Sequence, residues 1–293
     1  MSRNNDRSFF HEDEPPKDSD PAPMVASSAQ NESTSGTDFQ WSIPTEVVSL
    51  PSAGQFYTEG HPLHNKTSVE IRYMTAKEED ILSSRTLIKE GVAVDRMLQN
   101  LLIDKSVDIN SLLLGDKNAL IIASRITGYG PEYKTKVTCP SCSSTNEHTF
   151  DLTVQNTNDI TEGLTSTQAA LTNEGTFTLT LPLSKATIEC KFLTGHDEVR
   201  NFNKNKKRHR AARDKSNLTD SIFSFIVSIN GTNEPVSMRQ FVDRMPARDS
   251  KFLRNAYNQI APNVDLTQIY ECAECGYEAA LEVPLTVDFF WPK

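Results

Sequence analysis

The sequence predicts an α+β protein, with a small helical layer followed by a β-rich region that a mixed strand and helix insertion splits in two. Apolar residues recur at helical spacings between residues 75 and 127, and the sequence becomes rich in strand-like segments after residue 131 before helices return near Asp197. Two matching Cys-x-x-Cys turns stand 129 residues apart. With 293 residues, 37% of them hydrophobic, the chain is long enough to bury a sizeable core.

We expect four regions. Residues 1–40 are rich in Ser, Asn, Asp, Glu and Pro and poor in large aliphatic residues, which predicts a disordered acidic arm. Residues 41–130 hold strands and the helical layer. Residues 131–155 and 266–293 are the two halves of a ribbon that carries the paired cysteines, and residues 156–265 form the insertion, which includes a basic helix.

The helical layer follows a half-buried strand at Val69–Tyr73. Thr75 and Glu78 have the spacing of a capping box, which predicts a helix from Thr75 to about Glu90. A second helix carries apolar residues at 94, 97, 98, 101 and 102 on one face. A third is expected to begin near Asp116 as N-cap and to stop at Gly128.

In the insertion, strands are expected at Phe177–Leu181 and Ala186–Phe192, followed by a return to helices. The first of these is polar and basic, from Asp197 to about Lys215, and the second is strongly apolar, from Leu218 to Ile229. Two further helix starts are predicted, at a capping box of Ser237 with Gln240 and at Pro246.

Each cysteine pair lies at the tip of a predicted hairpin, with the spacing of a zinc knuckle. Two facing knuckles supply the four thiolates that Zn²⁺ favours, so we expect a structural zinc site formed by Cys139, Cys142, Cys272 and Cys275. Gly276 can take the positive φ that such a turn uses, whereas the first pair has Ser143 in that place.

Other interpretations of the cysteines remain open. A disulfide or a redox pair is one alternative, although neither pair precedes a convincing helix whose dipole would lower a thiol pKa. Unrelated buried thiols are another. Four thiolates fill the coordination shell, so chemistry at the metal is disfavoured. The fifth cysteine, Cys190, lies in a strand pattern and reads as a small buried hydrophobe, and His61 and His64 read as residues of a solvated loop.

Two segments are candidates for binding a partner. The run from Lys204 to Lys215 contributes a charge of +6 to a chain whose net charge is -9, and its candidate contacts are Lys206, Lys207, Arg208, Arg210 and Arg213. A solvated helix face explains the same run without any partner. Near the end of the chain, Phe289, Phe290 and Trp291 either fold back into the core or insert into a neighbouring protein.

Several functions are disfavoured. The acidic net charge opposes wholesale nucleic-acid binding, and the basic run holds no aromatic residues that would stack on bases. The sequence shows no Walker A pattern, dinucleotide fingerprint or HExxH motif, so we expect neither an enzyme nor a small-molecule substrate. It also shows no apolar stretch long enough for a membrane span and no export signal, so we expect an intracellular protein.

Several segments together are specific enough to suggest a family. They are Pro51-Ser52-Ala53-Gly54, the run from Met74 to Leu82, Gly115 to Ala119, Thr127 to Tyr133, and Cys139-Pro140-Ser141-Cys142. In this order they resemble the baseplate hub proteins of T-even-like contractile-tailed bacteriophages, from about Pro51 to the end of the chain. The resemblance implies a hub subunit or hub-assembly factor that binds other baseplate and tail proteins. It also implies assembly in the host cytoplasm and a place in the virion tail.

Two functions from other classes stay open at this point. A zinc-ribbon nucleic-acid-binding or transcription-associated factor would use the basic run, and its DNA affinity would fall steeply with salt. A thiol oxidoreductase would need a Cys-x-x-Cys thiol of low pKa that reacts rapidly with disulfides.

Overall fold

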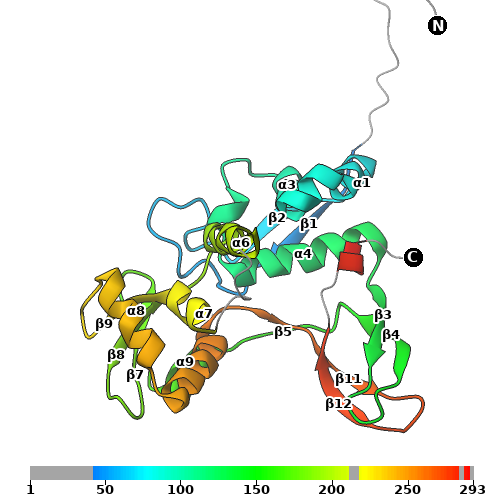
Figure 1. Ribbon diagram of the computed structural model, residues 1–293. Helices are drawn as coiled ribbons and strands as arrows, with labels where there is room; N and C mark the ends of the chain where they lie inside the picture. The colour runs from blue at the N-terminus through cyan, green and yellow to red at the C-terminus, as the bar shows by residue number, and fades with distance from the viewer. Residues whose placement is uncertain (1–41, 211–217, 284–286, 291–293) are drawn as a thin grey trace, which may run out of the picture. The chain divides into compact units, whose positions relative to one another are not determined.

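The computed structural model describes residues 42–210, 218–283 and 287–290, with side chains for all of these except 205–210 and 287–288. The disordered arm expected at residues 1–40 lies outside this part of the chain. The described residues form an α+β fold of helices and small antiparallel sheets, as the sequence predicts (Figure 1).

The first part of the fold is a two-stranded antiparallel ladder followed by helices. The ladder pairs β1 (Thr45–Ser49) with β2 (Ser68–Arg72), with Val47 opposite Glu70. The helical elements that follow are α1 (Ala76–Ser83), α2 (Arg85–Glu90), α3 (Ala93–Leu101), η1 (Ile109–Ser111) and α4 (Leu114–Tyr129).

The predicted start of α1 is confirmed, but the single helix expected up to Glu90 is two helices. The Glu78 carboxylate accepts a hydrogen bond from the Thr75 backbone N–H at 3.0 Å, as a capping box requires. The same carboxylate holds Arg72 of β2 through two hydrogen bonds of 2.6 and 2.9 Å. The helix breaks at Ser84, which has extended backbone angles, and α2 ends where Gly91 adopts φ 77°.

Asp116 is not the N-cap of α4, so that prediction is wrong. The helix begins two residues earlier, and Asp116 is a fully buried residue of its first turn. Its carboxylate accepts hydrogen bonds from the Ser52 N–H at 2.9 Å, the Ser52 hydroxyl at 2.6 Å and the Tyr57 hydroxyl at 2.7 Å. Burial raises the pKa of Asp116, and these three donors oppose the rise. Asp116 therefore fixes the turn at 51–54 against α4, and the helix continues past Gly128 to Tyr129.

Two long hairpins flank the insertion in sequence. The first pairs β3 (Glu132–Thr138) with β4 (Thr145–Asp151), and the second pairs β11 (Thr267–Glu271) with β12 (Glu278–Glu282). Next to them, β5 (Asn156–Thr157) pairs antiparallel with β10 (Val264–Asp265). The two ends of the insertion therefore meet in a ladder of their own.

The insertion holds a four-stranded antiparallel sheet and helices. The sheet order is β6 (Ala170–Leu171), β7 (Thr176–Thr180), β8 (Thr187–Lys191) and β9 (Ile226–Ile229). The helices are α5 (Ile160–Thr167), α6 (Gly195–Arg210), α7 (Leu218–Phe225), α8 (Pro235–Arg244) and α9 (Ala247–Ile260), and the 3₁₀ helix η2 (Val287–Phe290) comes near the end of the chain.

Two predictions in the insertion are wrong. The apolar run from Leu218 is a helix only to Phe225, since Ile226–Ile229 is a strand that pairs with β8. The capping box of Ser237 with Gln240 does not form. Glu234 is the N-cap of α8, and its carboxylate accepts the N–H groups of Val236 and Ser237. The helix after Pro246 and the β7–β8 pair are confirmed.

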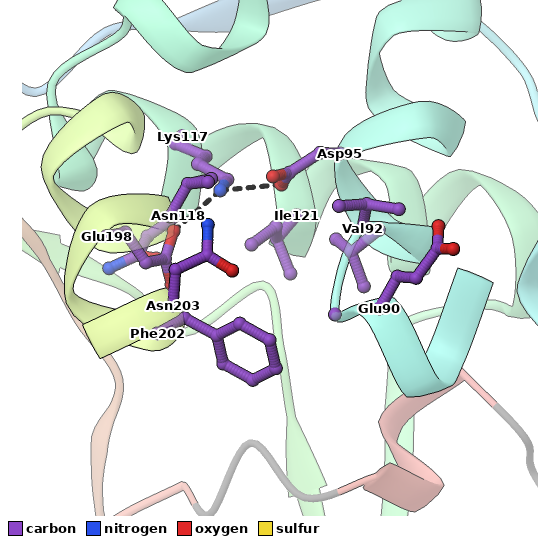
Figure 2. Close-up of a pocket in the computed structure, with 12 residues that line it drawn as sticks. Glu90, Val92, Asp95, Lys117, Asn118, Ile121, Glu198, Phe202 and Asn203 are labelled. Carbon is purple, nitrogen blue, oxygen red and sulfur yellow. Dashed lines mark hydrogen bonds and ion pairs between the residues drawn. The ribbon is translucent and has the colours of Figure 1, made fainter. Parts of the chain in front are cut away.

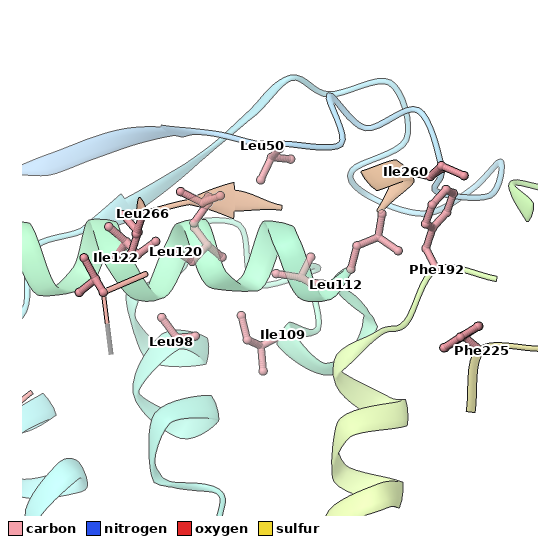
Figure 3. Packing of buried hydrophobic residues seen from close by; sticks show 14 of the residues in the cluster. Leu50, Leu98, Ile109, Leu112, Leu120, Ile122, Phe192, Phe225, Ile260 and Leu266 are labelled. Atoms are coloured by element: carbon pink, nitrogen blue, oxygen red, sulfur yellow. The ribbon is translucent and has the colours of Figure 1, made fainter. Parts of the chain in front are cut away.

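The buried hydrophobic residues form one cluster that joins the insertion to the rest of the described chain. Figure 3 shows α4 among the side chains of this cluster, with Leu120 and Ile122 on the helix and Leu50, Leu98 and Leu266 from other segments around it. The helix α4 therefore lies within the same core as the insertion and the β1–β2 ladder.

Candidate metal centre

Four cysteines from the two hairpins converge at one place. Cys139 and Cys142 lie between β3 and β4, and Cys272 and Cys275 lie between β11 and β12. Their Sγ atoms all lie within 4.8 Å of one another. Two of the sulfur pairs cross from one hairpin to the other, since Cys139 Sγ is 3.8 Å from Cys275 Sγ and Cys142 Sγ is 3.8 Å from Cys272 Sγ.

These distances fit a shared ion rather than a disulfide. A disulfide brings two sulfurs to about 2.05 Å, and all five cysteines of the chain are free. Zinc–thiolate bonds of about 2.3 Å in a regular tetrahedron place neighbouring sulfurs about 3.8 Å apart. The cross-hairpin separations equal this edge length, so the cluster is compatible with a metal site.

The two cysteine turns have the same backbone geometry. In the first, the Cys139 N–H donates to the Ser144 carbonyl and the Ser143 N–H donates to the Cys139 carbonyl. In the second, Cys272 N–H donates to Tyr277 and Gly276 N–H donates to Cys272, at matching positions and at matching lengths of 2.8–2.9 Å. Ser143 has φ 59° and Gly276 has φ 65°, so the serine adopts the conformation that the glycine adopts with less strain.

Hydrogen bonds around the cluster favour charged sulfur. Ser144 Oγ lies 3.6 Å from Cys272 Sγ and 2.9 Å from Cys142 Sγ. The Ser144 hydroxyl, together with the backbone amides of Cys275 and Glu274, lowers the pKa of Cys272 to about 5, although desolvation opposes this. The Tyr277 amide favours the Cys275 thiolate, but desolvation and the neighbouring sulfurs outweigh it and raise the pKa of Cys275 to about 12. A cation between the four sulfurs would offset this repulsion, so the cluster is compatible with a metal site.

Each hairpin contributes one buried and one exposed cysteine, and a glutamine side chain links the two hairpins beside the cluster. Cys139 and Cys272 are each 1% exposed, whereas Cys142 and Cys275 are exposed. The Gln268 side chain joins the hairpins, because its amide donates to the Asp151 carbonyl at 2.6 Å and accepts from the Asp151 N–H at 3.2 Å. No cue in the sequence distinguished Gln268 from other polar strand residues.

The predicted partner-binding residues have different outcomes. Lys206, Lys207, Arg208 and Arg210 belong to α6, but their side chains are outside the described set, and Arg213 and Trp291 lie outside the described residues altogether. Phe289 and Phe290 are 2% and 4% exposed, so they follow the first of the two alternatives and pack within the chain. Burial makes them unavailable to a partner in this structure.

A buried arginine explains why these two aromatic residues fold back. Arg125 of α4 is 2% exposed and donates from Nε to the Phe289 carbonyl at 2.7 Å. Its other nitrogens donate to the carbonyls of Gly130 and Glu132 at 2.8 and 3.2 Å. The Phe289 ring meets the Tyr133 ring edge-on at 5.1 Å. Arg125 thus ties η2 to the base of the first hairpin, a role that sequence spacing could not indicate.

The remaining candidates fall outside the cluster. Cys190 is fully buried in β8, and burial raises the pKa of its thiol. His61 Nε2 lies 2.9 Å from Ser111 Oγ, and His64 Nδ1 lies 2.6 Å from the Tyr57 carbonyl. Both histidines, which lie in the loop before β2, therefore have structural partners, and the Ser111 partner of His61 belongs to η1. In the described residues, no helix is long and apolar enough to cross a membrane.

Sequence reasoning missed one charged cluster that borders a cavity of about 280 Å³ (Figure 2). The Lys117 ammonium lies 2.6 Å from a carboxylate oxygen of Asp95 and 2.6 Å from one of Glu198. Although burial opposes its charge, the two carboxylates raise the pKa of Lys117. The lysine joins α3, α4 and α6, and since it stands next to Asp116 in a helix start, its sequence context predicts only a capping region.

The fold and the site define an α+β protein in which two cysteine-bearing hairpins, far apart in sequence, form one cluster. Residues 44–291, most of the chain, match the model of the family described as T4 bacteriophage base plate protein. The chain belongs to this family, which confirms the phage baseplate part of the resemblance. The searches of curated proteins and of solved structures found no significant match.

Proposed function

We propose that the chain is a structural or assembly component of the central hub of a contractile phage tail baseplate and that it acts without catalysis. The family match over residues 44–291 carries this proposal. The narrower assignment to the hub rests on the resemblance of the segments between Pro51 and Cys142. Its partners are then other baseplate and tail proteins, met in the host cytoplasm during assembly and retained in the virion tail.

We also propose that the four cysteines hold a structural Zn²⁺. The donor set supports zinc because four thiolates suit this ion and leave no coordination position for a substrate. The cross-hairpin sulfur distances of 3.8 Å support it independently. The ion supplies charge balance for the thiolates, and the Ser144 hydroxyl and the knuckle amides orient them.

One experiment tests both proposals. The tagged chain is purified from phage-infected cells, its companions are identified by mass spectrometry, and its metal content is measured in the same sample. We expect baseplate proteins and about one zinc per chain. Recovery without tail proteins would count against the hub, and a zinc-free chain would count against the metal.

A matched pair of variants makes the metal test specific. Cys272→Ser removes one ligand, and we expect zinc retention to fall sharply. Cys190→Ser also removes a thiol, from a strand of the insertion rather than from the cluster. It should keep its zinc even if its stability falls. Equal zinc content in the two variants would show that Cys272 is not a ligand.

A further inference from the structure

The outer edge of β1 carries backbone groups that the described part of the chain leaves unpaired. Two hydrogen bonds set the phase of the β1–β2 ladder, from Tyr73 N–H to the Pro44 carbonyl and from Leu50 N–H to the Thr67 carbonyl. Since antiparallel pairing alternates along a strand, the even-numbered residues of β1 face β2. Thr45, Val47 and Ser49 therefore point their N–H and C=O groups outward, and no described residue hydrogen-bonds to them.

The other edge of the same ladder is covered. The Ile103 N–H donates to the Glu70 carbonyl at 3.1 Å, and Leu102 forms an antiparallel bridge with Ile71. The segment after α3 thus continues the ladder beyond β2. The unpaired edge of β1 stands in contrast to this arrangement.

A groove runs along the unpaired edge. It has a volume of about 480 Å³ and is lined by four consecutive residues of β1, Glu46–Ser49. Its α4 lining consists of Ala119, Ala123, Ile126 and Thr127, at helical spacing, and Thr127 is the only polar side chain of the four. Val264 of β10 lines it too, and the bond from Asn158 N–H to the Asn263 carbonyl shows that Val264 turns its own backbone groups away from β5.

The edge lacks the usual protection against strand pairing. Proteins block such edges with lysines, prolines or bulges inside the strand, and β1 reads Thr-Glu-Val-Val-Ser in unbroken register with β2. Val47 is 64% exposed. The one charge on this strand is the carboxylate of Glu46, which lines the groove.

We propose that an extended segment of another protein adds to β1 as a further strand, with apolar side chains at alternate positions in the groove and a basic side chain beside Glu46. Pairing would satisfy the outward groups of Thr45, Val47 and Ser49, and the α4 residues would receive every second side chain. Charge complementarity with Glu46 selects a basic rather than an acidic segment. That the partner is a baseplate protein rests on the proposed function, whereas the groove itself does not.

The test uses the full-length chain and an array of overlapping peptides of about 12 residues, long enough to span a typical strand. The peptides tile the phage's tail proteins and an equal number of host proteins. Binding is measured by fluorescence polarisation for the native chain, Val47→Pro and Val47→Thr. Proline removes one outward N–H that makes no bond to β2, and edge strands tolerate it, so the β1–β2 ladder should survive. Threonine keeps the N–H and the β-branched shape.

We expect bound peptides with apolar residues at alternate positions, an affinity loss of about tenfold or more for Val47→Pro, and no loss for Val47→Thr. Hydrogen exchange gives a second measurement that does not depend on the variant. The bound peptide should protect the amides of Thr45, Val47 and Ser49 and leave Val48, already paired with β2, unchanged.

Three outcomes overturn the proposal. They are the absence of any bound peptide, equal binding by Val47→Pro and the native chain, and slow exchange of the three amides in the isolated chain, which would mean that the chain itself fills the groove. If strand-adding peptides come only from host proteins, the strand addition stands and the baseplate partner fails.

Discussion

The left-handed turn of each cysteine knuckle can be tested by exchanging its residue type. Ser143 has φ 59° and Gly276 has φ 65° in equivalent positions. A residue other than glycine is strained in this region of φ by roughly 1–2 kcal/mol. Glycine loses more conformational entropy on folding, which offsets about 0.4–1 kcal/mol of this difference. A Cβ on Gly276 would meet no atom within 4 Å, so conformation alone decides the effect. Gly276→Ala should destabilise the knuckle by about 0.5–1 kcal/mol, and Ser143→Gly should stabilise it by a similar amount.

Because metal binding and knuckle folding are linked, the change should appear in zinc affinity as about a two- to fivefold decrease or increase. Competition with a chromophoric chelator measures it. Ser141→Gly is the control, since Ser141 is exposed in the same knuckle without a positive φ and should bring no gain. If Ser143→Gly weakens zinc binding while Gly276→Ala leaves it unchanged, the knuckles do not have the paired geometry described above.

Two further predictions concern buried charge. Burial raises the pKa of Glu78, but hydrogen bonds from Arg72 and Thr75 outweigh it and lower the pKa to about 2. The lowered pKa contributes about 2–3 kcal/mol of stability above pH ~4.5 that is lost as the pH falls toward 2. Urea unfolding between pH 3 and 7 should show this loss in the free energy of unfolding. If a Glu78→Gln variant loses stability with pH as steeply as the native chain, the lowered pKa of Glu78 is not the cause. Arg125→Met leaves the buried carbonyl of Phe289 and the partly buried carbonyls of Gly130 and Glu132 without their donor, and should destabilise the protein by about 2–4 kcal/mol. Limited proteolysis should then cut faster near Phe289, and an unchanged digest would contradict the tether.

The sequence predicts best those features that local chemistry decides. The turn geometry of Gly276, the helix start at Thr75 and the hairpins around both cysteine pairs all follow from spacing and backbone preference within a few residues. Convergence of the cysteine pairs was predictable because four thiolates in two knuckles share one favoured ligand arrangement. The separation of 129 residues does not oppose this prediction, since the entropic cost of closing a loop grows only slowly with its length.

The sequence fails where a distant partner decides the role of a residue. Asp116 looks like an N-cap, but Ser52 and Tyr57, more than 50 residues away, take up its carboxylate and draw it into the core. Ile226–Ile229 continues an apolar helical run, yet pairing with β8 makes it a strand. Glu234 outcompetes the Ser237 pattern for the start of α8. For Asp116 and for Ile226–Ile229, a tertiary contact outweighs a local preference that is worth about 1 kcal/mol or less, whereas at α8 one local cap replaces another.

The β5–β10 ladder changes what the metal is expected to do. It already joins the ends of the insertion, so the cluster closes a loop of roughly 20 residues rather than 129. At about 0.6 kcal/mol per doubling of loop length, the stabilisation that the metal gives by restricting the unfolded chain is about 1.6 kcal/mol smaller than the cysteine spacing alone suggests. Metal removal should therefore loosen the knuckles and leave the insertion folded. Hydrogen exchange after chelation should speed up at residues 138–145 and 271–278 and stay slow in β7 and β8. Loss of protection in β7 and β8 at the same rate as in the knuckles would show that the metal, and not the ladder, holds the insertion in place.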